Sequence, residues 1–315
     1  MAWQEFIIGK KKKQDVMEFR QNLIDNIVEL QGELVNKTYR HGGYKSFYVN
    51  DPKRRLIHKA SVRDRLLHHA IHRILYPFFD KTFIADSFSC RDNKGAHKAI
   101  NRFRKLSYVV SKNYTRACWV LKCDIKSFFA SIDHKVLVEI LETYIPDREI
   151  LRLLENIIAS FHTKSTPGVG LPLGNLTSQL FANVYMNRLD QWVKHALKSR
   201  YYARYADDFI FLADGKHALE KIIPKVQVFL KSDLKLTLHP DKVFIKTASS
   251  GVDFLGWLHF SDHRILRAKT KQRMFRSIRR SPKEATVQSY LGLMRHGNSH
   301  QLRREVLGEY WLWQG

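Results

Sequence analysis

Cysteine is scarce in this chain and shows no metal-binding pattern. The 315 residues include 3 cysteines, Cys90, Cys118 and Cys123. Their number is odd, and they lack the paired spacing of a zinc site. Cys118 and Cys123 flank an apolar stretch, which indicates buried apolar side chains in a reducing compartment. The fold therefore does not depend on a disulfide framework or on a cysteine-based metal domain.

Long apolar runs are also missing. No run approaches the roughly 20 residues that a membrane-spanning helix needs. The first nine residues form too short an apolar lead for a signal peptide, and lysines follow them. Internal repeats and low-complexity linkers are missing as well. We expect a chain with no membrane partner that is long enough for two or three packed subdomains.

Acidic residues are few compared with basic ones. The chain has 30 Asp and Glu against 54 Lys and Arg, which gives a net charge of +24. Basicity for solubility alone rarely needs such an excess, whereas a polyanionic partner and salt-sensitive binding suit it. The basic residues concentrate at positions 10–13 and at Arg264, Arg267, Lys269, Lys271, Arg273, Arg276, Arg279 and Arg280. The charge pattern predicts a nucleic-acid partner.

Two of the few carboxylates, Asp207 and Asp208, are adjacent and lie between apolar runs. The flanking segments 201–206 and 209–212 are rich in aromatic and aliphatic residues, which favours strands. The sequence therefore predicts a β-hairpin with both carboxylates near its tip. Like charges this close repel each other, and a divalent cation would stabilise both in the ionised form. The alternative is a solvated turn.

A third carboxylate, Asp124, follows a predicted buried strand at 117–121. A helix is expected after it, capped by Ser131 or Asp133. A strand-end carboxylate that faces the 205–208 hairpin could hold two Mg²⁺ ions, roughly 3.5–4 Å apart, as in two-metal phosphoryl transfer. A helix cap or a salt-bridge partner is the alternative for Asp124.

A glycine- and proline-rich loop lies between these elements. Residues 168–174 include three glycines and Pro172, so unusual backbone angles are expected there. Apolar residues at helical spacing then predict a helix from 176 to about 197, with Asn175 or Thr177 as its cap. Such a loop lets the backbone approach a nucleotide closely, although it could equally be an ordinary join between a loop and a helix.

In this order, these three elements resemble the palm of reverse transcriptases. Asp124 matches the first catalytic Asp, the loop and helix match the nucleotide-binding segment, and 205–208 match the tyrosine-x-Asp-Asp box. The resemblance extends from about residue 38 to the C-terminus. It includes further blocks at 51–57, 62–65, 87–91, 239–242 and 254–257.

The loop sequence narrows the resemblance. Retroviral and group II intron reverse transcriptases usually have Pro-Gln-Gly where this chain has Pro172-Leu173-Gly174. The stretches 176–185 and 289–298 are similar to those of the reverse transcriptases of diversity-generating retroelements, within the group II intron-like prokaryotic enzymes. We therefore identify that family as the one the chain most resembles.

The resemblance implies an α+β right-hand polymerase. Its fingers, with an N-terminal extension, would cover residues 1–115 and include a helix over 64–77. The palm, an antiparallel sheet backed by helices, would cover 116–262, and a helical thumb would cover 263–315. The protein would be cytoplasmic and encoded by a prokaryote or a phage.

The resemblance also implies roles for individual residues. Asp124, Asp207 and Asp208 would be catalytic and would bind two Mg²⁺ ions, with Mn²⁺ as an alternative, helped by the backbone carbonyl of Ile125. The nucleotide would be contacted by Lys53, Arg55, Phe129, Leu173, Gly174, Gln179 and Lys242. The primer grip would consist of Phe254, Leu255, Gly256 and Trp257.

Two of these assignments have structural alternatives. A bulky ring at Phe129 would clash with a ribose 2′-hydroxyl and select deoxynucleotides, but Phe129 could also be a core residue. Lys242 could donate a proton to pyrophosphate or serve as a simple charge partner. The cations Lys53 and Arg55 would hold the triphosphate, where Arg can bind bidentately.

The implied function is RNA-directed DNA synthesis from a template RNA, with a primer, its cDNA product and dNTPs as further partners. Leu173 cannot form the hydrogen bonds that Gln makes in related enzymes. We therefore expect low fidelity at template adenines. The family also implies an accessory variability protein, a small basic pentameric helical bundle. The alternatives are a retron-type or phage-defence reverse transcriptase, a non-catalytic RNA-binding palm, and an RNA-templated RNA polymerase, against which Phe129 argues.

Overall fold

The computed structural model describes residues 1–51, 53–163, 166–281 and 283–312. Pro52, which belongs to the predicted fingers block, lies outside these ranges. The chain forms two compact units, each assembled from separate segments. The first unit comprises 1–85, 125–198 and 226–238, and the second comprises 86–124, 199–225 and 239–315.

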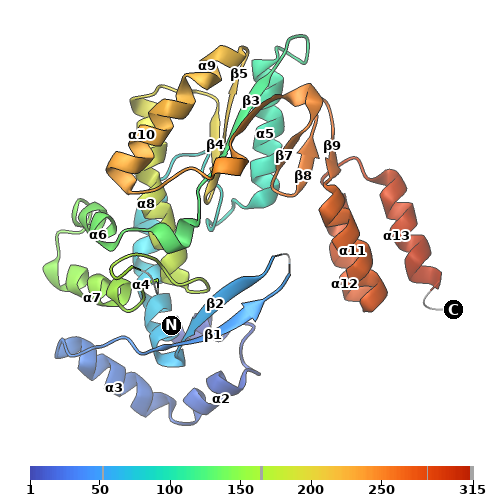
Figure 1. The fold of residues 1–315 in the computed structure, drawn as a ribbon. Coiled ribbons are helices and arrows are strands. Elements are labelled where there is room, and N and C mark those ends of the chain that lie inside the picture. Colours follow the sequence, from blue (N-terminus) through green and yellow to red (C-terminus); the bar gives the residue numbers. More distant parts are fainter. Residues whose placement is uncertain (52, 164–165, 282, 313–315) are drawn as a thin grey trace. The chain divides into compact units, whose positions relative to one another are not determined.

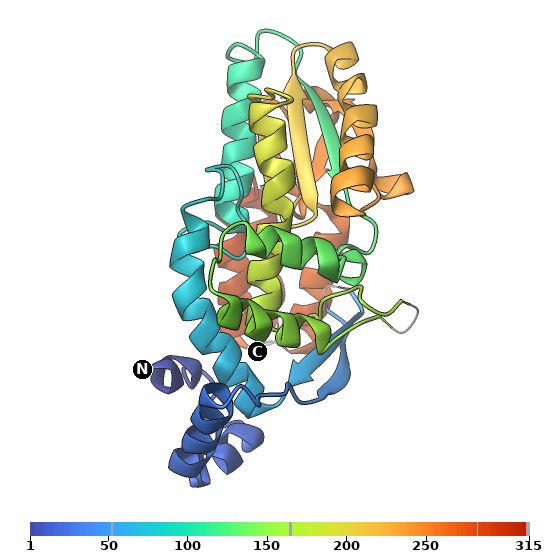
Figure 2. The same cartoon turned by 90° about the vertical axis from the view of Figure 1, so that its left-hand side faces the viewer.

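The second unit is built on a four-stranded antiparallel sheet in the order β4-β5-β3-β6 (Figure 1). Its strands are β3 (Trp119–Asp124), β4 (Tyr202–Tyr205), β5 (Asp208–Ala213) and β6 (Phe244–Thr247). Strand β3 is central because it pairs with both β5 and β6, and Figure 2 shows β3 and β5 side by side. The expected antiparallel sheet is confirmed, and β3 ends at Asp124 as predicted.

Helices of the second unit cover this sheet. Helix α5 (Ala96–Val110) contacts β4 and β5 through a buried stripe, and the short α9 (Lys216–Glu220) contacts β3, β5 and β6. The stripe on α5 recurs every three or four residues, as a helix with one buried face requires. It consists of Ala99, Ile100, Phe103, Leu106 and Val110.

A second antiparallel sheet leads into three C-terminal helices. Its strands are β7 (Val252–Phe254), β8 (Trp257–His259) and β9 (Arg264–Leu266). The helices that follow are α11 (Ala268–Arg280), α12 (Glu284–Met294) and α13 (His300–Leu312). One apolar core joins α5, both sheets and these helices, with Phe103, Val120, Ile210, Phe254, Trp257, Met274, Ile278 and Val306 among its members.

The C-terminal helices approach β8 closely at one glycine. A Cβ added to Gly297, in the loop between α12 and α13, would lie 2.0 Å from the Trp257 ring. Real Cβ atoms essentially never come this close to another heavy atom. Any side chain at position 297 would therefore push the loop away from β8.

The first unit contains a β-hairpin and most of the helices. The hairpin consists of β1 (Tyr44–Val49) and β2 (Arg55–Ala60). The helices and 3₁₀ turns are α1 (Ala2–Phe6), α2 (Gln14–Gln21), α3 (Leu23–Val35), α4 (Val62–Asp80), η1 (Phe128–Ser131), α6 (His134–Glu142), α7 (Arg148–Ala159) and α8 (Leu176–His195). Helix α10 (Ile222–Leu234) begins in the second unit and lies mostly in the first.

The predicted helices of the first unit are present. Helix α4 extends the expected 64–77 segment at both ends and contains Pro77. Asp133 caps α6 by accepting a hydrogen bond from the Val136 amide at 3.0 Å. Asn175 takes the N-cap position of α8, but its side chain makes no capping bond. The expected α+β class is thus confirmed, while the division into fingers, palm and thumb stays a prediction.

None of the helices in the described ranges combines the length and the apolar character that crossing a bilayer requires. Cys118 and Cys123 are buried free thiols, as expected, and Cys90 is an exposed one.

Candidate active site

Strand pairing places the predicted catalytic carboxylates at one end of the four-stranded sheet. In the register of β3 and β5, Asp124 lies directly opposite Asp208. Strands β4 and β5 form a hairpin that is closed by the pair Tyr205 and Asp208, which leaves Ala206 and Asp207 as a two-residue turn. The predicted hairpin is confirmed, and it brings an acid from position 124 to an acid pair more than 80 residues later in the sequence.

The turn has unusual backbone geometry. Ala206 has a φ of 55°, in the left-handed region that residues other than glycine rarely adopt. Its carbonyl accepts a hydrogen bond at 3.0 Å from Nη1 of Arg204, and Nη2 of Arg204 donates to the Ser87 hydroxyl at 3.0 Å. Arg204 is fully buried. It therefore holds the turn that presents Asp207 and Asp208.

A segment beside β4 supports this arginine. The Phe88 amide donates to the carbonyl of Arg204 at 3.0 Å, and the Arg204 amide donates to the carbonyl of Asp86 at 2.9 Å. The Asp86 carboxylate accepts two bonds from the Arg102 guanidinium, at 2.7 and 3.0 Å. This bidentate pair anchors the segment to α5.

The sequence interpretation missed Arg204, Asp86 and Arg102. A charged residue within the apolar run before the hairpin was the available signal for Arg204. Its partners Ser87 and Asp86 lie more than 110 residues earlier, so the sequence alone could not identify them.

Two lysines pair with the opposed carboxylates. Lys242 Nζ lies 2.8 Å from Asp124 Oδ1, and Lys122 Nζ lies 3.3 Å from Asp208 Oδ2. Lys242 is positioned by the 3₁₀ turn η2 (Pro240–Lys242), because the His239 amide before it donates to the Asp124 carbonyl at 2.7 Å. Of the two roles considered for Lys242, charge partner is the one that these contacts describe.

Asp208 is held in an unfavourable setting for a charge. Burial, and to a smaller extent the nearby charges of Asp124 and Asp207, raise its pKa to about 7 against the opposing effect of Lys122. Its Oδ1 atom is buried and has no hydrogen-bond partner. A buried carboxylate oxygen that lacks a partner normally costs free energy.

These residues fit a divalent cation in their chemistry. Carboxylate oxygens are the ligands that Mg²⁺ prefers. The Oδ1 atom of Asp208, which has no hydrogen-bond partner, could coordinate such a cation. Within the described ranges, however, no group of three or more His, Cys, Asp or Glu side chains is gathered as a metal site. Lysines pair with two of the acids instead. The metal-binding roles of Asp124, Asp207, Asp208 and the Ile125 carbonyl stay predictions.

The predicted nucleotide loop belongs to the first unit and packs on the β1–β2 hairpin. The His58 amide in β2 donates to the Leu173 carbonyl at 2.9 Å, and the Asn175 side-chain amide donates to the His58 carbonyl at 3.1 Å. Gly174 has a φ of 108°, and a Cβ there would lie 2.7 Å from Ile57 Cγ2. Glycine is therefore required at 174 for both backbone angle and space.

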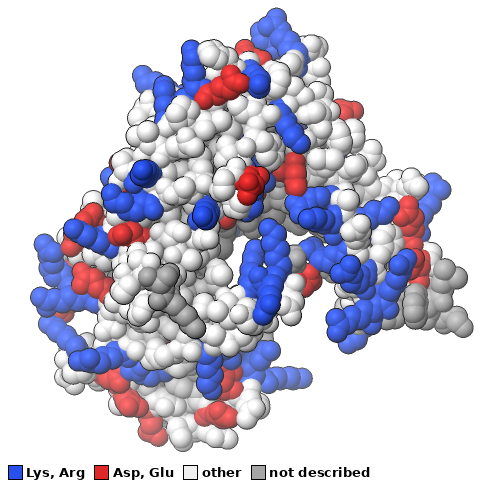
Figure 3. All heavy atoms as spheres, in the orientation of Figure 1, with Lys and Arg blue, Asp and Glu red and all other residues white. Residues whose placement is uncertain are grey.

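Four further residues that were predicted to bind the nucleotide also lie in the first unit, whereas Lys242 lies in the second. Lys53 and Arg55 are exposed at the tip of the hairpin, where Figure 3 shows a group of basic side chains. Phe129 and Gln179 are half-buried, in η1 and α8 respectively. Neighbouring Phe128 is the buried ring of η1, so Phe129 keeps exposed surface. Its role as a steric gate stays a prediction.

The predicted primer grip forms the tight hairpin of β7 and β8. Leu255 and Gly256 form its turn, and both have positive φ, 52° and 83°. Such angles match the right-handed twist of the flanking strands. Phe254 and Trp257 are buried core residues, so only the turn itself is available for contact with a partner.

A carboxylate pair on a hairpin, opposite a third acid at the end of the central strand, is the arrangement that the sequence predicts for a nucleic acid polymerase. The family comparison agrees: the model of the reverse transcriptase (RNA-dependent DNA polymerase) family matches residues 49–259. The chain belongs to this family, and its enzyme class is RNA-directed DNA polymerase.

The individual relatives share low sequence identity with this chain. The chain is 26% identical over 293 residues to protein YkfC of Escherichia coli (strain K12), covering 81% of this chain and 75% of that protein. It is 23% identical over 324 residues to the group II intron-encoded protein LtrA of Lactococcus lactis subsp. cremoris, covering 81% of this chain and 52% of LtrA. The chain thus spans about half the length of LtrA.

A solved structure shares the fold. The apo telomerase of Candida tropicalis truncated from its C-terminal domain matches with a TM-score of 0.55 at 12% identity, over 76% of this chain and 59% of that chain. At this identity the likeness concerns the fold alone. It agrees with a mixed fold of helices and antiparallel sheet.

Proposed function

We propose that this chain copies an RNA template into DNA at the cluster of Asp124, Asp207 and Asp208. One observation supports this most strongly: Asp124 and Asp208 are paired across β3 and β5, next to Asp207 in the turn. When bound, two Mg²⁺ ions would activate the primer 3′-hydroxyl and stabilise the leaving pyrophosphate.

The chain's own residues would divide the remaining work. Asp124 and Asp208 would hold the ions from opposite strands, and Asp207 from the turn. Arg204 would fix the turn through the Ala206 carbonyl. Lys242, now paired with Asp124, carries a positive charge that would suit the leaving phosphates.

Primer extension tests this proposal. Wild-type protein should extend a DNA primer on an RNA template only with a divalent ion, and Asp207→Asn should lose at least ~100-fold in rate, as expected when a metal ligand is removed. Asp214→Asn is the matched control, because Asp214 is an exposed acid immediately after β5. Equal rates for wild type and Asp207→Asn would refute the assignment.

We further propose that copying is error-prone at template adenines, as in diversity-generating retroelements. Leu173 supports this, because its side chain cannot form a hydrogen bond to the nucleotide, and its backbone carbonyl is already bonded to His58. Selectivity against a wrong base pair depends on contacts that differ between right and wrong transition states.

Sequencing of cDNA measures this property. The Leu173→Gln variant should lower misincorporation opposite adenine while leaving errors at the other template bases nearly unchanged. Leu176→Gln, a half-buried leucine at the start of α8, controls for the general effect of a new amide. Adenine errors no more frequent than errors at other bases in wild type would exclude the mutagenic role.

The similarity to the group II intron-encoded protein LtrA supports a second candidate, a group II intron-like reverse transcriptase without the mutagenic role. The two candidates differ in partner, since only the first calls for an accessory variability protein, a pentameric helical bundle. Co-purification with such a protein encoded nearby would favour the mutagenic role. In either case we expect the enzyme in the cytoplasm of a prokaryotic or phage-infected cell.

A further inference from the structure

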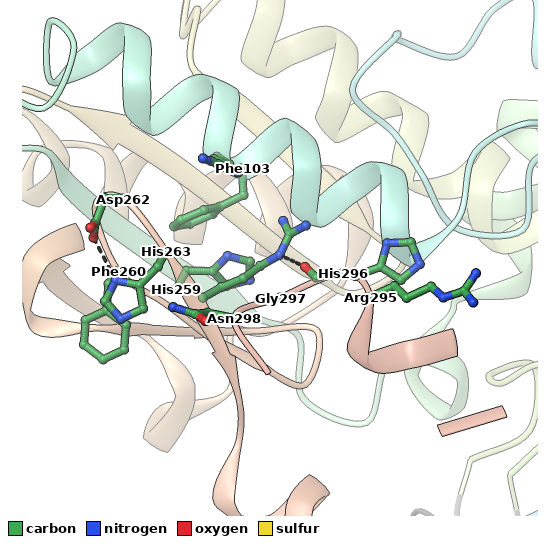
Figure 4. Close-up of a pocket in the computed structure, with 11 residues that line it drawn as sticks. Phe103, His259, Phe260, Asp262, His263, Arg295, His296, Gly297 and Asn298 are labelled. Atoms are coloured by element: carbon green, nitrogen blue, oxygen red, sulfur yellow. Dashed lines mark hydrogen bonds and ion pairs between the residues drawn. The ribbon is translucent and has the colours of Figure 1, made fainter. Parts of the chain in front are cut away.

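A cavity of about 310 Å³ lies in the second unit, and none of the three carboxylates lines it. Its walls come from α5, from the β8–β9 segment and from the loop between α12 and α13 (Figure 4). None of the residues that line it was predicted to be catalytic or to bind metal, nucleotide or primer, although Arg264 belongs to the basic group noted in the sequence. Its volume lies near the lower end of the range for small-molecule sites, roughly 300–1,000 Å³.

Three arginines line this cavity: Arg104 of α5, Arg264 of β9 and Arg295 of the loop. In the part of the chain that the structure describes, no carboxylate forms an ion pair with any of them. The acid at the rim, Asp262, is largely exposed and bonds to His263 at 2.8 Å. Within the described residues, the cavity therefore holds three guanidinium groups that form no ion pair with a carboxylate, with Asp262 as the one acid in its lining.

Arg264 is fixed in place but incompletely satisfied. Its Nη2 donates to Asn101 Oδ1 at 2.7 Å, and its Nε donates to the carbonyl of His296. Nη1 is buried and has no hydrogen-bond partner. Burial and the nearby charge of Arg104 lower the pKa of Arg264. Two guanidinium groups held near each other without an acid are stabilised by an anion.

Flat rings complete the walls. Phe260 and His263 stack with centroids 4.7 Å apart and an interplanar angle of 12°. Burial lowers the pKa of His259 to about 4 and also lowers the pKa of His296. These two imidazoles are therefore neutral at pH 7, so the arginines supply the charge while the rings supply apolar surface.

We propose that this cavity binds a phosphate ester of mononucleotide size, with its phosphate held by Arg104 and Arg264 and with Arg295 adding positive charge at the edge of the cavity. The arginine fork suits phosphate oxygens, and the rings suit the attached nucleoside. A bare phosphate would leave most of the cavity unfilled. The site does not depend on the proposed function, because no residue of the carboxylate cluster lines it.

Calorimetric titration in EDTA tests the proposal, since metal-dependent nucleotide binding at the carboxylates is then suppressed. AMP should bind to the wild-type protein and adenosine should not. Arg104→Gln should weaken AMP binding roughly tenfold, the effect of one charge-assisted hydrogen bond. Arg295→Gln should weaken it less, because the Arg295 side chain extends away from Arg264 in Figure 4. Both side chains are exposed, so these variants should fold normally. Arg264 is left unchanged because it also bonds to Asn101 and His296.

Lys105→Gln is the matched control, because Lys105 is the exposed neighbour of Arg104 on α5 and does not line the cavity. It should bind AMP like the wild type. Equal weakening by all three substitutions, or adenosine binding as tightly as AMP, would overturn the proposal.

A short single-stranded RNA with a 5′-phosphate distinguishes the source of the phosphate. Tighter binding of this RNA than of AMP, with the same dependence on Arg104, would assign the site to a strand end. Binding no tighter than that of AMP would assign it to the free nucleotide. Asp207→Asn should bind AMP normally in EDTA while losing primer extension, so a failure of the two proposals can be told apart.

Discussion

Replacing Asp208 by Asn should make the protein more stable while it abolishes DNA synthesis. The carboxyl of Asp208 is 18% exposed, and its Oδ1 is buried without a partner. Burial is the main reason why its pKa rises from 3.8 to about 7. The folded state therefore resists ionisation of this group more than the unfolded chain does.

The sign and size of the change in the free energy of unfolding follow from this rise in pKa. Well below about pH 4 the Asp208 carboxyl is protonated in both the folded and the unfolded state, so it does not lower the free energy of unfolding. As the pH rises from about 4 to about 7, the unfolded chain releases the proton first, so stability is lost. Above pH 7 the loss reaches about 4 kcal/mol, since one pKa unit corresponds to roughly 1.4 kcal/mol. An Asn amide, which is also polar, would recover only part of this, about 2 kcal/mol.

Urea unfolding at about pH 8 and about pH 4.5 measures this effect. The variant Asp208→Asn should be more stable than wild type by about 2 kcal/mol at the higher pH and no more stable than wild type at the lower one, where the wild-type loss is only about 1 kcal/mol. Asp214→Asn, the exposed control, should change the free energy of unfolding by at most ~0.5 kcal/mol at either pH. Saturating Mg²⁺ should narrow the gap by stabilising wild type alone. A gain that is equal at both pH values, or none at pH 8, would refute the reasoning.

Three further predictions concern the supports of the site. Arg204→Met should slow primer extension and lower the free energy of unfolding by about 3 kcal/mol, because the turn loses two charged hydrogen bonds. The exposed control Arg116→Met should do neither, and a wild-type unfolding curve for Arg204→Met would contradict the role of Arg204. Gly174→Ala should lower the free energy of unfolding in urea by roughly 1–3 kcal/mol, whereas Gly215→Ala, with open space around its Cβ position, should leave it unchanged. Equal effects of the two variants would be evidence against the close approach of Gly174 to β2. Lys122→Met should raise the pKa of Asp208, so the acid limb of the pH–rate profile should move to higher pH. An unchanged acid limb would argue against the electrostatic coupling between Lys122 and Asp208.

The parts of the site that follow local rules could be predicted from the sequence. Strands on both sides of Asp207 and Asp208 follow from aromatic and β-branched runs that must pair. Asp124 at a strand end follows from the apolar stretch before it. The helix from Leu176 follows from apolar residues at helical spacing. In each case the pattern and the fold obey the same short-range periodicity.

The parts that depend on contacts between distant segments could not be predicted. Arg204 looks like an unexplained charge in a strand until Ser87 and the Ala206 carbonyl are placed beside it. The raised pKa of Asp208 depends on burial, which the sequence does not reveal. The arginine cavity joins α5 to a loop almost 200 residues later, so its three cations form no motif in the sequence.

The contact between Gly297 and Trp257 matters for anyone who wishes to improve this enzyme in the laboratory. A combinatorial library that randomises the 295–298 loop would yield mostly inactive clones, because every codon other than glycine at position 297 forces the ring or the loop to move. Keeping that codon fixed while diversifying its exposed neighbours would preserve the close contact between the α12–α13 loop and β8. Selection could then act on binding properties rather than on the survival of the fold.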